Sequence, residues 1–310
     1  VDEEEFDVGV DISGGKDING NLDDVEMPQV FDVDTVKPTV VSATAVPDPV
    51  GGGTGTVTVT VEFSEAMDTT VSPTVEVTGL ASSPYAVSGS FSDSDTWVGS
   101  FTLIDDEEEE TATISVEDGE DARGNVMIAD PTAGSFEVDT LDPSVTYLDV
   151  SDYLITEADV PGNFYVYVTF SETMDTAVAP DIDFTADVET SGTLTFSSGA
   201  WDLGDTRYTA TYSIADVDEE VDDVDVAVSG AQDLIGNVDP TIYYNLFDVD
   251  TIRPTVDDIE VSDDFIKEDD IPGTFDVTVT FSEPMNTAVI PTIDFDPDVS
   301  STLVYNTGAW

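Results

Sequence analysis

The sequence predicts an all-β protein made of tandem β-sandwich domains, with a partial domain at each end. An anchor segment containing Val-Asp-Thr occurs three times, and its aspartates Asp34, Asp139 and Asp250 are separated by 105 and 111 residues. That period is too long for a solenoid repeat and suits an independent domain. Between the anchors, apolar and polar residues alternate, Val, Thr, Tyr and Phe are frequent, and Gly, Pro and Asp interrupt the runs. This pattern is typical of short β-strands joined by turns.

The anchors divide the chain into a fragment, two whole domains and a second fragment. Residues 1–35 align without a gap to residues 217–251, and 18 of the 35 positions are identical. We therefore expect the first fragment to be the last two strands of a domain. The predicted parts are residues 1–34, 35–139, 140–250 and 251–310.

The last part of the chain repeats the beginning of a domain. Ile252–Val299 align without a gap to Leu141–Val188. Together the two fragments lack only the equivalent of Asp202–Asp216, which contains one predicted strand. Three explanations stay open: a slice of a longer tandem protein, a subunit whose ends complement those of the next copy, or one period of a continuous fibre. Each of them places more protein against both ends, because an open half-sandwich exposes apolar faces and unpaired strand edges.

Seven short strands are expected in the second whole domain, and no segment shows a helical period. Seven strands in a domain of this length predict a seven-stranded immunoglobulin-like sandwich, although the cysteine pair of antibody domains is missing. The predicted strands are Val145–Val150, Phe164–Phe170, Asp181–Thr185, Thr193–Phe196, Tyr208–Ile214, Val224–Val228 and Ile242–Val249.

Aromatic residues on these strands are expected to serve mainly packing. Along Asn163–Phe170 the apolar residues alternate with Tyr165 and Tyr167, so the two tyrosines should point away from the core. We expect them to be plain surface, with cover of an edge or contact with a neighbour as the alternative. The recurring tryptophans are expected to pack at a sandwich edge rather than to stack on carbohydrate; they are Trp97, Trp201 and Trp310.

The charge of the chain restricts its partners. There are 69 Asp and Glu residues against 6 Lys and Arg residues, so the formal net charge is −63, while 40% of the residues are hydrophobic, enough for packed cores. Such a field repels nucleic acid and anionic lipid and attracts cations. Adaptation to a very saline medium and a set of calcium sites both explain it, and both stay open. The acidic run Asp105–Glu110 is expected to be a solvated loop or strand end.

Missing residue types exclude several kinds of chemistry. The chain has no cysteine and no histidine, which excludes disulfides, thiolate chemistry, imidazole bases and histidine-ligated zinc. No run approaches the ~20 apolar residues of a membrane-spanning helix. Paired carboxylates occur in every repeat, whereas an enzyme concentrates its catalytic carboxylates in one place, so we expect no enzyme.

Three acidic motifs are expected to meet at each domain junction. They are the Val-Asp-Thr linker, the Phe-Ser-Glu segment after the second strand, and the Asp-x-x-Gly-Asn loop between the last two strands. In an immunoglobulin-like sandwich these segments lie at one pole. Oxygen ligands in such number suit Ca²⁺, which binds six to eight of them. The candidate ligands are Asp34, Glu65, Asp68, Asp121 and Asn125 at the first junction, Asp139, Glu172, Asp175, Asp233 and Asn237 at the second, and Asp250, Glu283 and Asn286 at the third.

A purely structural explanation of the same residues stays open. Asp-x-x-Gly-Asn is also a good tight turn, in which Asp and Asn bond their own backbone and Gly supplies a positive φ. An aspartate at a strand end can be a solvated linker residue.

The combination of Phe-Ser-Glu-x-Met, Asp-x-x-Gly-Asn and Phe-x-Val-Asp-Thr-x-x-Pro resembles bacterial and archaeal Ig-like (Big-type) tandem repeats of S-layer proteins, adhesins and surface filaments. The resemblance covers nearly the whole chain. It implies an extracellular or cell-surface structural segment, joined head to tail to copies of itself or to adjoining domains of one long chain. The alternative that it implies is an adhesin segment that binds glycans or surfaces.

Overall fold

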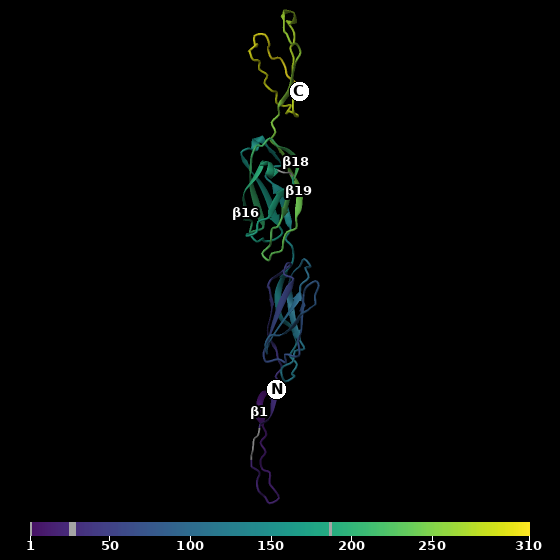
Figure 1. The fold of residues 1–310 in the computed structure, drawn as a ribbon, viewed down its shortest axis with the longest axis vertical. Coiled ribbons are helices and arrows are strands. Elements are labelled where there is room, and N and C mark those ends of the chain that lie inside the picture. The colour runs from purple at the N-terminus through teal and green to yellow at the C-terminus, as the bar shows by residue number, and fades with distance from the viewer. Residues whose placement is uncertain (1, 25–28, 186–187) are drawn as a thin grey trace.

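The computed structural model describes residues 2–24, 29–185 and 188–310 and shows a thin, elongated molecule. Two β-sandwiches follow each other along the long axis, with a narrow hairpin before them and an open, strand-poor part after them (Figure 1). The predicted all-β fold class is confirmed. The helices among the described residues are single turns, and none is long and apolar enough to cross a membrane.

The first sandwich consists of a four-stranded and a five-stranded sheet. The four-stranded sheet contains, in spatial order, β3 (Val40–Val46), β5 (Thr56–Phe63), β9 (Thr96–Thr102) and β8 (Ser88–Phe91). The five-stranded sheet contains β4 (Val50–Gly51), β11 (Asp130–Asp139), β10 (Glu109–Glu117), β6 (Thr74–Thr78) and β7 (Tyr85–Ala86).

The second sandwich has two four-stranded sheets. One contains β12 (Val145–Val150), β14 (Gly162–Phe170), β17 (Arg207–Ile214) and β16 (Leu194–Asp202). The other contains β13 (Leu154–Thr156), β19 (Ile242–Asp250), β18 (Glu220–Ser229) and β15 (Asp181–Phe184). All seven strands predicted for this domain are present. The short β13, the 3-10 turn η1 (Glu157–Asp159) and the one-turn helix α1 (Val188–Ser191) are additional.

The first strand of each sandwich is divided between the two sheets. In the second sandwich β12 pairs antiparallel with β14, whereas β13, a few residues later, pairs parallel with β19. In the first sandwich β4 pairs parallel with β11 in the same way. The last strand of the first sandwich, β11, therefore lies between β10 and β4, and the last strand of the second, β19, lies between β18 and β13. Each ends next to the following linker.

Each sandwich has its own core, built by the alternation seen in the sequence. On β14, Phe164, Val166 and Val168 are fully buried, as predicted, and Phe164 packs against Phe247 of the opposite sheet with ring centroids 4.7 Å apart. Trp97 is fully buried and donates a hydrogen bond from Nε1 to Ser72 Oγ (3.1 Å). Burial of each such side chain stabilises the fold by roughly 1.5–3 kcal/mol.

The two end parts are open. The first consists of the antiparallel pair β1 (Glu4–Gly9) and β2 (Gln29–Asp34), which matches the two strands expected there. The last contains the pair β20 (Val256–Val261) and β21 (Val277–Phe281) and the 3-10 turn η2 (Glu268–Asp270).

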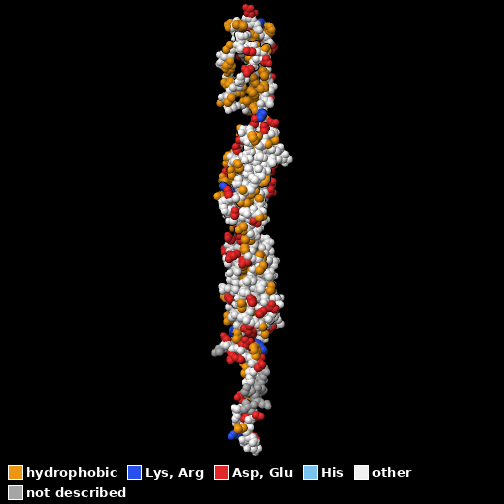
Figure 2. Space-filling view, turned by 90° about the vertical axis from the view of Figure 1, so that its left-hand side faces the viewer, with side chains coloured by type: hydrophobic (Ala, Val, Ile, Leu, Met, Phe, Trp, Pro, Cys, Tyr) orange, Lys and Arg blue, Asp and Glu red, His pale blue; other side chains and the backbone are white. Residues whose placement is uncertain are grey.

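Apolar side chains of the last part lie around a cavity of about 1140 Å³ instead of in a closed core. Phe275, Val277 and Val279 occupy the positions of Phe164, Val166 and Val168 but are only partly buried. Figure 2 shows the resulting concentration of hydrophobic side chains over the C-terminal part, at the top of the view.

Candidate cation sites at the domain junctions

Two loops of each sandwich lie side by side at the pole that faces the preceding part of the chain. In the first sandwich Met67 forms a β-bridge with Asp121, and the Asp68 N–H donates to the carbonyl of Glu120 (2.8 Å). In the second sandwich the bridge joins Met174 and Asp233. The Phe-Ser-Glu segment and the Asp-x-x-Gly-Asn loop thus meet, as the sequence predicts.

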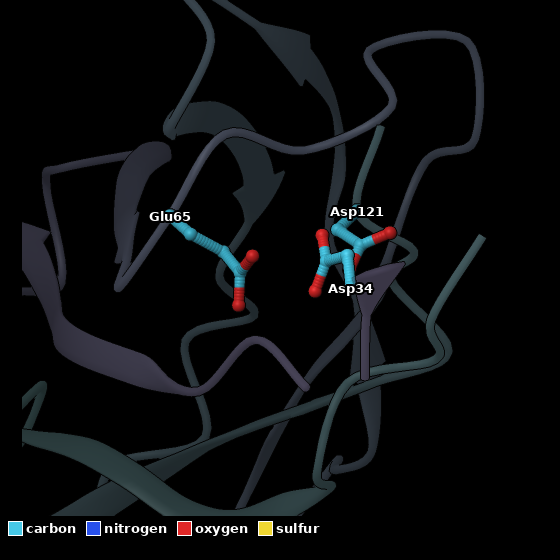
Figure 3. A group of neighbouring side chains, drawn as sticks. All are labelled: Asp34, Glu65 and Asp121. Atoms are coloured by element: carbon cyan, nitrogen blue, oxygen red, sulfur yellow. The ribbon is translucent and has the colours of Figure 1, made fainter. Parts of the chain in front are cut away.

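At the first junction, Asp34, Glu65 and Asp121 form a group of three carboxylates (Figure 3). Each offers one carboxylate oxygen, and these oxygens all lie within 4.8 Å of one another. Asp34 is the last residue of β2, in the part before the sandwich, whereas Glu65 and Asp121 belong to the sandwich that follows. The group therefore spans the junction.

The second junction repeats this arrangement. Asp139, the last residue of β11, lies with Glu172 and Asp233 of the next sandwich, and their carboxylate oxygens again fall within 4.8 Å of one another. Asp233 is buried, with 2% of its surface exposed. The same group of three acids thus occurs at the first and the second junction.

At the third junction two predicted ligands have buried oxygens without partners. Asp250 Oδ1 and Glu283 Oε1 are inaccessible to solvent and accept no hydrogen bond from any described residue, and the same holds for Glu65 Oε1 at the first junction. Asn286 is exposed, and its Oδ1 accepts a hydrogen bond from the Ala288 N–H (3.0 Å). Among the described residues, no third acid joins Asp250 and Glu283 in such a group.

The Asp-x-x-Gly-Asn loops are tight turns as well as sources of a carboxylate. Asp233 Oδ1 accepts hydrogen bonds from the N–H groups of Ile235 (2.8 Å), Gly236 (2.6 Å) and Asn237 (2.9 Å). Gly236 has a φ of 100°, which favours glycine at that position. In the first sandwich Asp121 Oδ1 accepts two of the equivalent bonds, from the N–H groups of Arg123 (2.8 Å) and Asn125 (2.9 Å). The structural explanation of this motif is therefore correct for the turn, and the carboxylate still faces the junction.

The two asparagines bridge the loop to the linker. Asn125 Nδ2 donates to Asp121 Oδ2 (2.7 Å) and to the Asp34 carbonyl (3.3 Å). Asn237 Nδ2 donates to Asp233 Oδ2 (2.7 Å) and to the Asp139 carbonyl (3.0 Å). These amides position the acids through their N–H groups, whereas a metal ligand would use the amide oxygen.

Asp68 and Asp175 do not join the groups of three acids. Asp68 Oδ1 accepts hydrogen bonds from the Thr70 N–H (2.9 Å) and hydroxyl (2.7 Å), which together hold the pKa of Asp68 below its usual value. Asp175 Oδ1 accepts one from the Ala177 N–H (2.9 Å). Both side chains close a local turn after the Phe-Ser-Glu segment.

A fourth acid recurs at the junctions and was not among the predicted ligands. Glu4, Glu109 and Glu220 lie directly across from Asp34, Asp139 and Asp250 in the antiparallel pairs β1–β2, β10–β11 and β18–β19. The gapless alignment of residues 1–35 with 217–251 already places Glu4 on Glu220, so the sequence contained this signal.

The acidic run Asp105–Glu110 is largely exposed, but it is not only a solvated loop. Its fifth residue, Glu109, begins β10, and its charge contributes to the raised pKa values of Glu172 and Asp139. Glu108 accepts a hydrogen bond from the Ala81 N–H (2.9 Å), and the carboxylate of Asp105 lies against Gly52. The run therefore lines the pole that faces the second junction.

Crowding and burial alter the acidity of these groups. Burial and the charges of Asp233, Asp139 and Glu109 raise the pKa of Glu172 to about 7. Burial and the charges of Asp121, Asp34 and Glu4 raise the pKa of Glu65. For Asp121, burial acts in the same direction, but hydrogen bonds from its own loop outweigh it and lower the pKa. The junctions therefore concentrate negative charge that a bound cation would stabilise.

Basic residues occupy two of the three junctions. Arg123 contacts Asp32 (3.3 Å) and lies over the Phe6 ring at the first. Arg253 pairs with Glu157, and with Asp216 at 3.6 Å, at the third. Figure 2 shows acidic side chains gathered where consecutive parts of the molecule meet. Among the described residues, no ion pair crosses the second junction.

The second junction is instead closed by contact of a glycine backbone with side chains of the next sandwich. The Gly52 N–H of the first sandwich donates to Asn237 Oδ1 of the second (2.9 Å). A Cβ on Gly51 would lie 2.8 Å from Ile235 Cγ2, so glycine permits this close approach. The segment at the end of β4 in the first sandwich and the Asp-x-x-Gly-Asn loop of the second are thus packed together.

Fold and site together define an all-β protein with a repeated group of carboxylates between successive parts of its chain. A scan against protein-family models finds no matching family, and a search of curated proteins finds no relative.

Proposed function

We propose that this chain is a structural segment of an extracellular filament, S-layer or stalk, built from tandem Ig-like domains that cations hold rigid at their junctions. The observation that carries the proposal is the repeated group of three acids, which combines a linker aspartate with two acids of the following sandwich at the first and second junctions. A role in catalysis is not proposed, because the same acids recur from one repeat to the next.

Calcium is the cation that suits these groups. Ca²⁺ binds six to eight oxygen ligands in flexible geometry, and carboxylates are its commonest protein ligands. At the second junction Asp139, Glu172 and Asp233 would supply three of them, with Glu109 within electrostatic reach. Because the ligands come from two successive parts of the chain, one bound ion would resist bending between them.

The open ends support continuation of the rod by more protein. Phe6 and Phe31 of the first part are about half exposed, at 52% and 49%, and the last part holds the large apolar cavity. Adjoining domains of the same long chain, or copies of this chain placed head to tail, would cover these surfaces. The charge of −63 makes nucleic acid an unsuitable partner.

Removal of calcium tests the proposal. At constant high salt, the unfolding temperature and the particle length would be measured with calcium and with a chelator. We expect calcium to raise the unfolding temperature and to lengthen and straighten the particles. An unfolding temperature and a length that calcium leaves unchanged would refute cation-bridged junctions.

A segment of an adhesin is the second candidate function. It is favoured by a group of tyrosines on the outer face of one sheet of the second sandwich, since the other repeats of the chain lack these tyrosines.

A further inference from the structure

The outer face of the sheet β12-β14-β17-β16 carries a group of tyrosines. Tyr165 and Tyr167 alternate with the buried Phe164, Val166 and Val168 on β14 and so point away from the core. Asp149 of β12 lies directly across from Tyr167, and Tyr147 lies across from Thr169. We call Tyr147, Asp149, Tyr153, Tyr165 and Tyr167 the tyrosine face.

Contacts within the tyrosine face keep its rings in a fixed arrangement. The Tyr165 and Tyr167 rings are nearly parallel, at 18°, with centroids 6.2 Å apart. The hydroxyls of Tyr147 and Tyr153 both donate to the Asp149 carboxylate, the second at 2.8 Å. Tyr147 and Tyr153 nevertheless leave 53% and 63% of their surface exposed. Exposed rings held in place are suited to contact a ligand, because little side-chain entropy is lost on binding.

Charged groups are few on this face, although the chain is strongly acidic, and its central one, the Asp149 carboxylate, is held by neutral donors. The two tyrosine hydroxyls satisfy Asp149, and hydrogen bonding to them lowers its pKa. Further along the same face, Asp202 is paired with Arg207, whose Nε donates to Asp202 Oδ1 (2.7 Å). The other outward positions on β17 are Thr209, Thr211 and Ser213. The face thus offers aromatic rings and hydroxyl groups.

The tyrosines are absent from the equivalent positions of the other repeats. In the register β3–β5 of the first sandwich, these positions hold Ser42, Thr44, Thr58 and Thr60. In the register β20–β21 of the last part, they hold Asp258, Glu260, Asp276 and Thr278. The sandwich therefore folds without them, so packing of the repeat does not explain their presence.

We propose that the tyrosine face is a binding site for an uncharged polysaccharide. The flat ring faces would carry the C–H faces of sugar rings, and the tyrosine hydroxyls, the threonine hydroxyls and Asp149 would bond sugar hydroxyls. The negative field of the chain opposes anionic glycans and also a second copy, which would bring its own net charge of −63 against this face. The inference does not depend on cations at the junctions.

Affinity electrophoresis of the whole chain tests the site. The protein would be run in native gels that contain dextran, mannan or hydroxyethylcellulose, at constant calcium. We expect at least one of these neutral polymers to retard the protein, and the double variant Tyr165→Ala/Tyr167→Ala to weaken the interaction at least about tenfold, which is about 1.4 kcal/mol. Tyr165→Phe/Tyr167→Phe should keep most of the binding, because the rings remain.

A matched control is available on the opposite sheet. Tyr243 and Tyr244 of β19 are 63% and 49% exposed and lie outside the tyrosine face, so Tyr243→Ala/Tyr244→Ala should bind as the unchanged chain does. The unfolding temperature of each variant verifies the fold.

Three outcomes would overturn the site. They are an absence of retardation by all three polymers, equal loss of binding in both alanine variants, and concentration-dependent self-association that Tyr165→Ala/Tyr167→Ala abolishes, which would identify a contact between copies. None of them affects the response of length to calcium, so the failure of this site and the failure of the proposed function are distinguishable.

Discussion

At the scale of single residues, the acids of the second junction differ in the groups that surround their carboxylates. Asp233 has its carboxylate bonded by its own loop, whereas Glu172 has burial and like charges around it and no comparable donors. The glutamate is therefore the member of the group that responds most to a bound cation or a proton.

The raised pKa of Glu172 predicts how stability depends on pH without calcium. Its carboxyl group binds its proton more tightly in the folded state, where the pKa is about 7, than in the unfolded chain, where the pKa has its ordinary value of 4.5. Its contribution to stability is therefore fully present below pH 4.5 and is lost as the pH rises to about 7. In chelator, thermal unfolding of the second sandwich should show this loss across that range, and calcium should compensate more at pH 7.5 than at pH 5. A calcium effect independent of pH would contradict the assignment.

Substitution of the same residue separates repulsion from cation binding. We expect Glu172→Gln to raise the unfolding temperature in chelator, because it removes a crowded charge, and to reduce the further gain caused by calcium. Glu110→Gln removes an exposed charge outside the group and serves as the control. Differential scanning calorimetry with calcium and with chelator measures both effects, and equal behaviour of the two variants would argue against a site at Glu172.

A second acid, Asp239, is also buried, but it belongs to neither group of three acids. It is 3% exposed, neither carboxylate oxygen has a hydrogen-bond partner in the part of the chain that the structure describes, and burial together with the charge of Asp142 raises its pKa to about 6. Met127 occupies the same place in the first sandwich, since its N–H bonds the Gly119 carbonyl as that of Asp239 bonds Ala231.

This comparison predicts that Asp239→Met stabilises the second sandwich. Removal of an unsatisfied buried polar group should increase the free energy of unfolding by about 1–3 kcal/mol. The gain should be larger at pH 8 than at pH 5, because the carboxyl group is ionised above pH 6. Chemical denaturation at the two pH values measures it, with Asp239→Asn as a control that keeps a polar group in the same place. A loss of stability in the methionine variant would show that Asp239 has an unrecognised partner.

At the scale of elements, alternation predicted the long strands and missed the short ones. Strand β14 was predictable because a buried apolar residue stands at every second position. β13 has three residues and α1 has four, too few for a period to appear, and their structure depends on partners distant in the sequence.

Part of the candidate site was predictable for the same kind of reason. Asp139, Glu172 and Asp233 follow from motifs that recur in each repeat. Local hydrogen bonds explain why two other predicted ligands do not join the group. Asp175 accepts a bond within its own turn, and Asn237 donates its amide N–H groups to Asp139 and Asp233. The alignment of the repeats shows an acid that recurs at Glu4 and Glu220, but its position opposite the linker aspartate, as Glu109 lies opposite Asp139, depends on the pairing register of the strands.

The close approach of the Gly51 backbone to the Ile235 side chain at the second junction predicts that one glycine controls the rigidity of that junction. Gly51→Ala should loosen the packing of β4 against Ile235, since its Cβ would lie 2.8 Å from Ile235 Cγ2. Gly53→Ala is a matched control, because no atom lies within 4 Å of its Cβ position. Distances between spin labels placed on the two sandwiches should spread more widely in the first variant than in the second. Identical distance distributions would show that this contact does not fix the junction.

At the scale of the whole molecule, net charge and elongated shape act together. Carboxylates gathered at the junctions repel each other across successive parts of the chain, and dissolved salt screens that repulsion. The rod form places the successive junctions in line along one axis (Figure 1).

We therefore expect stability without calcium to increase steeply with sodium chloride concentration. Unfolding temperature in chelator, measured from low to molar salt, should rise and then level off as the charges become screened. The same series with calcium should begin higher and rise less, because bound ions already neutralise the junctions. If the two series rise in parallel, the effect of salt comes from the charge of the whole chain and not from the junction groups, which would contradict this expectation.

Each junction group is divided between two consecutive units: the aspartate ends the last strand of one, and the other acids project from loops of the next. Such a site does not exist until both units have folded. A chain that folds progressively from one end would thus acquire its ion-binding capacity junction by junction, and a misfolded unit would disable two sites, the one before it and the one after it.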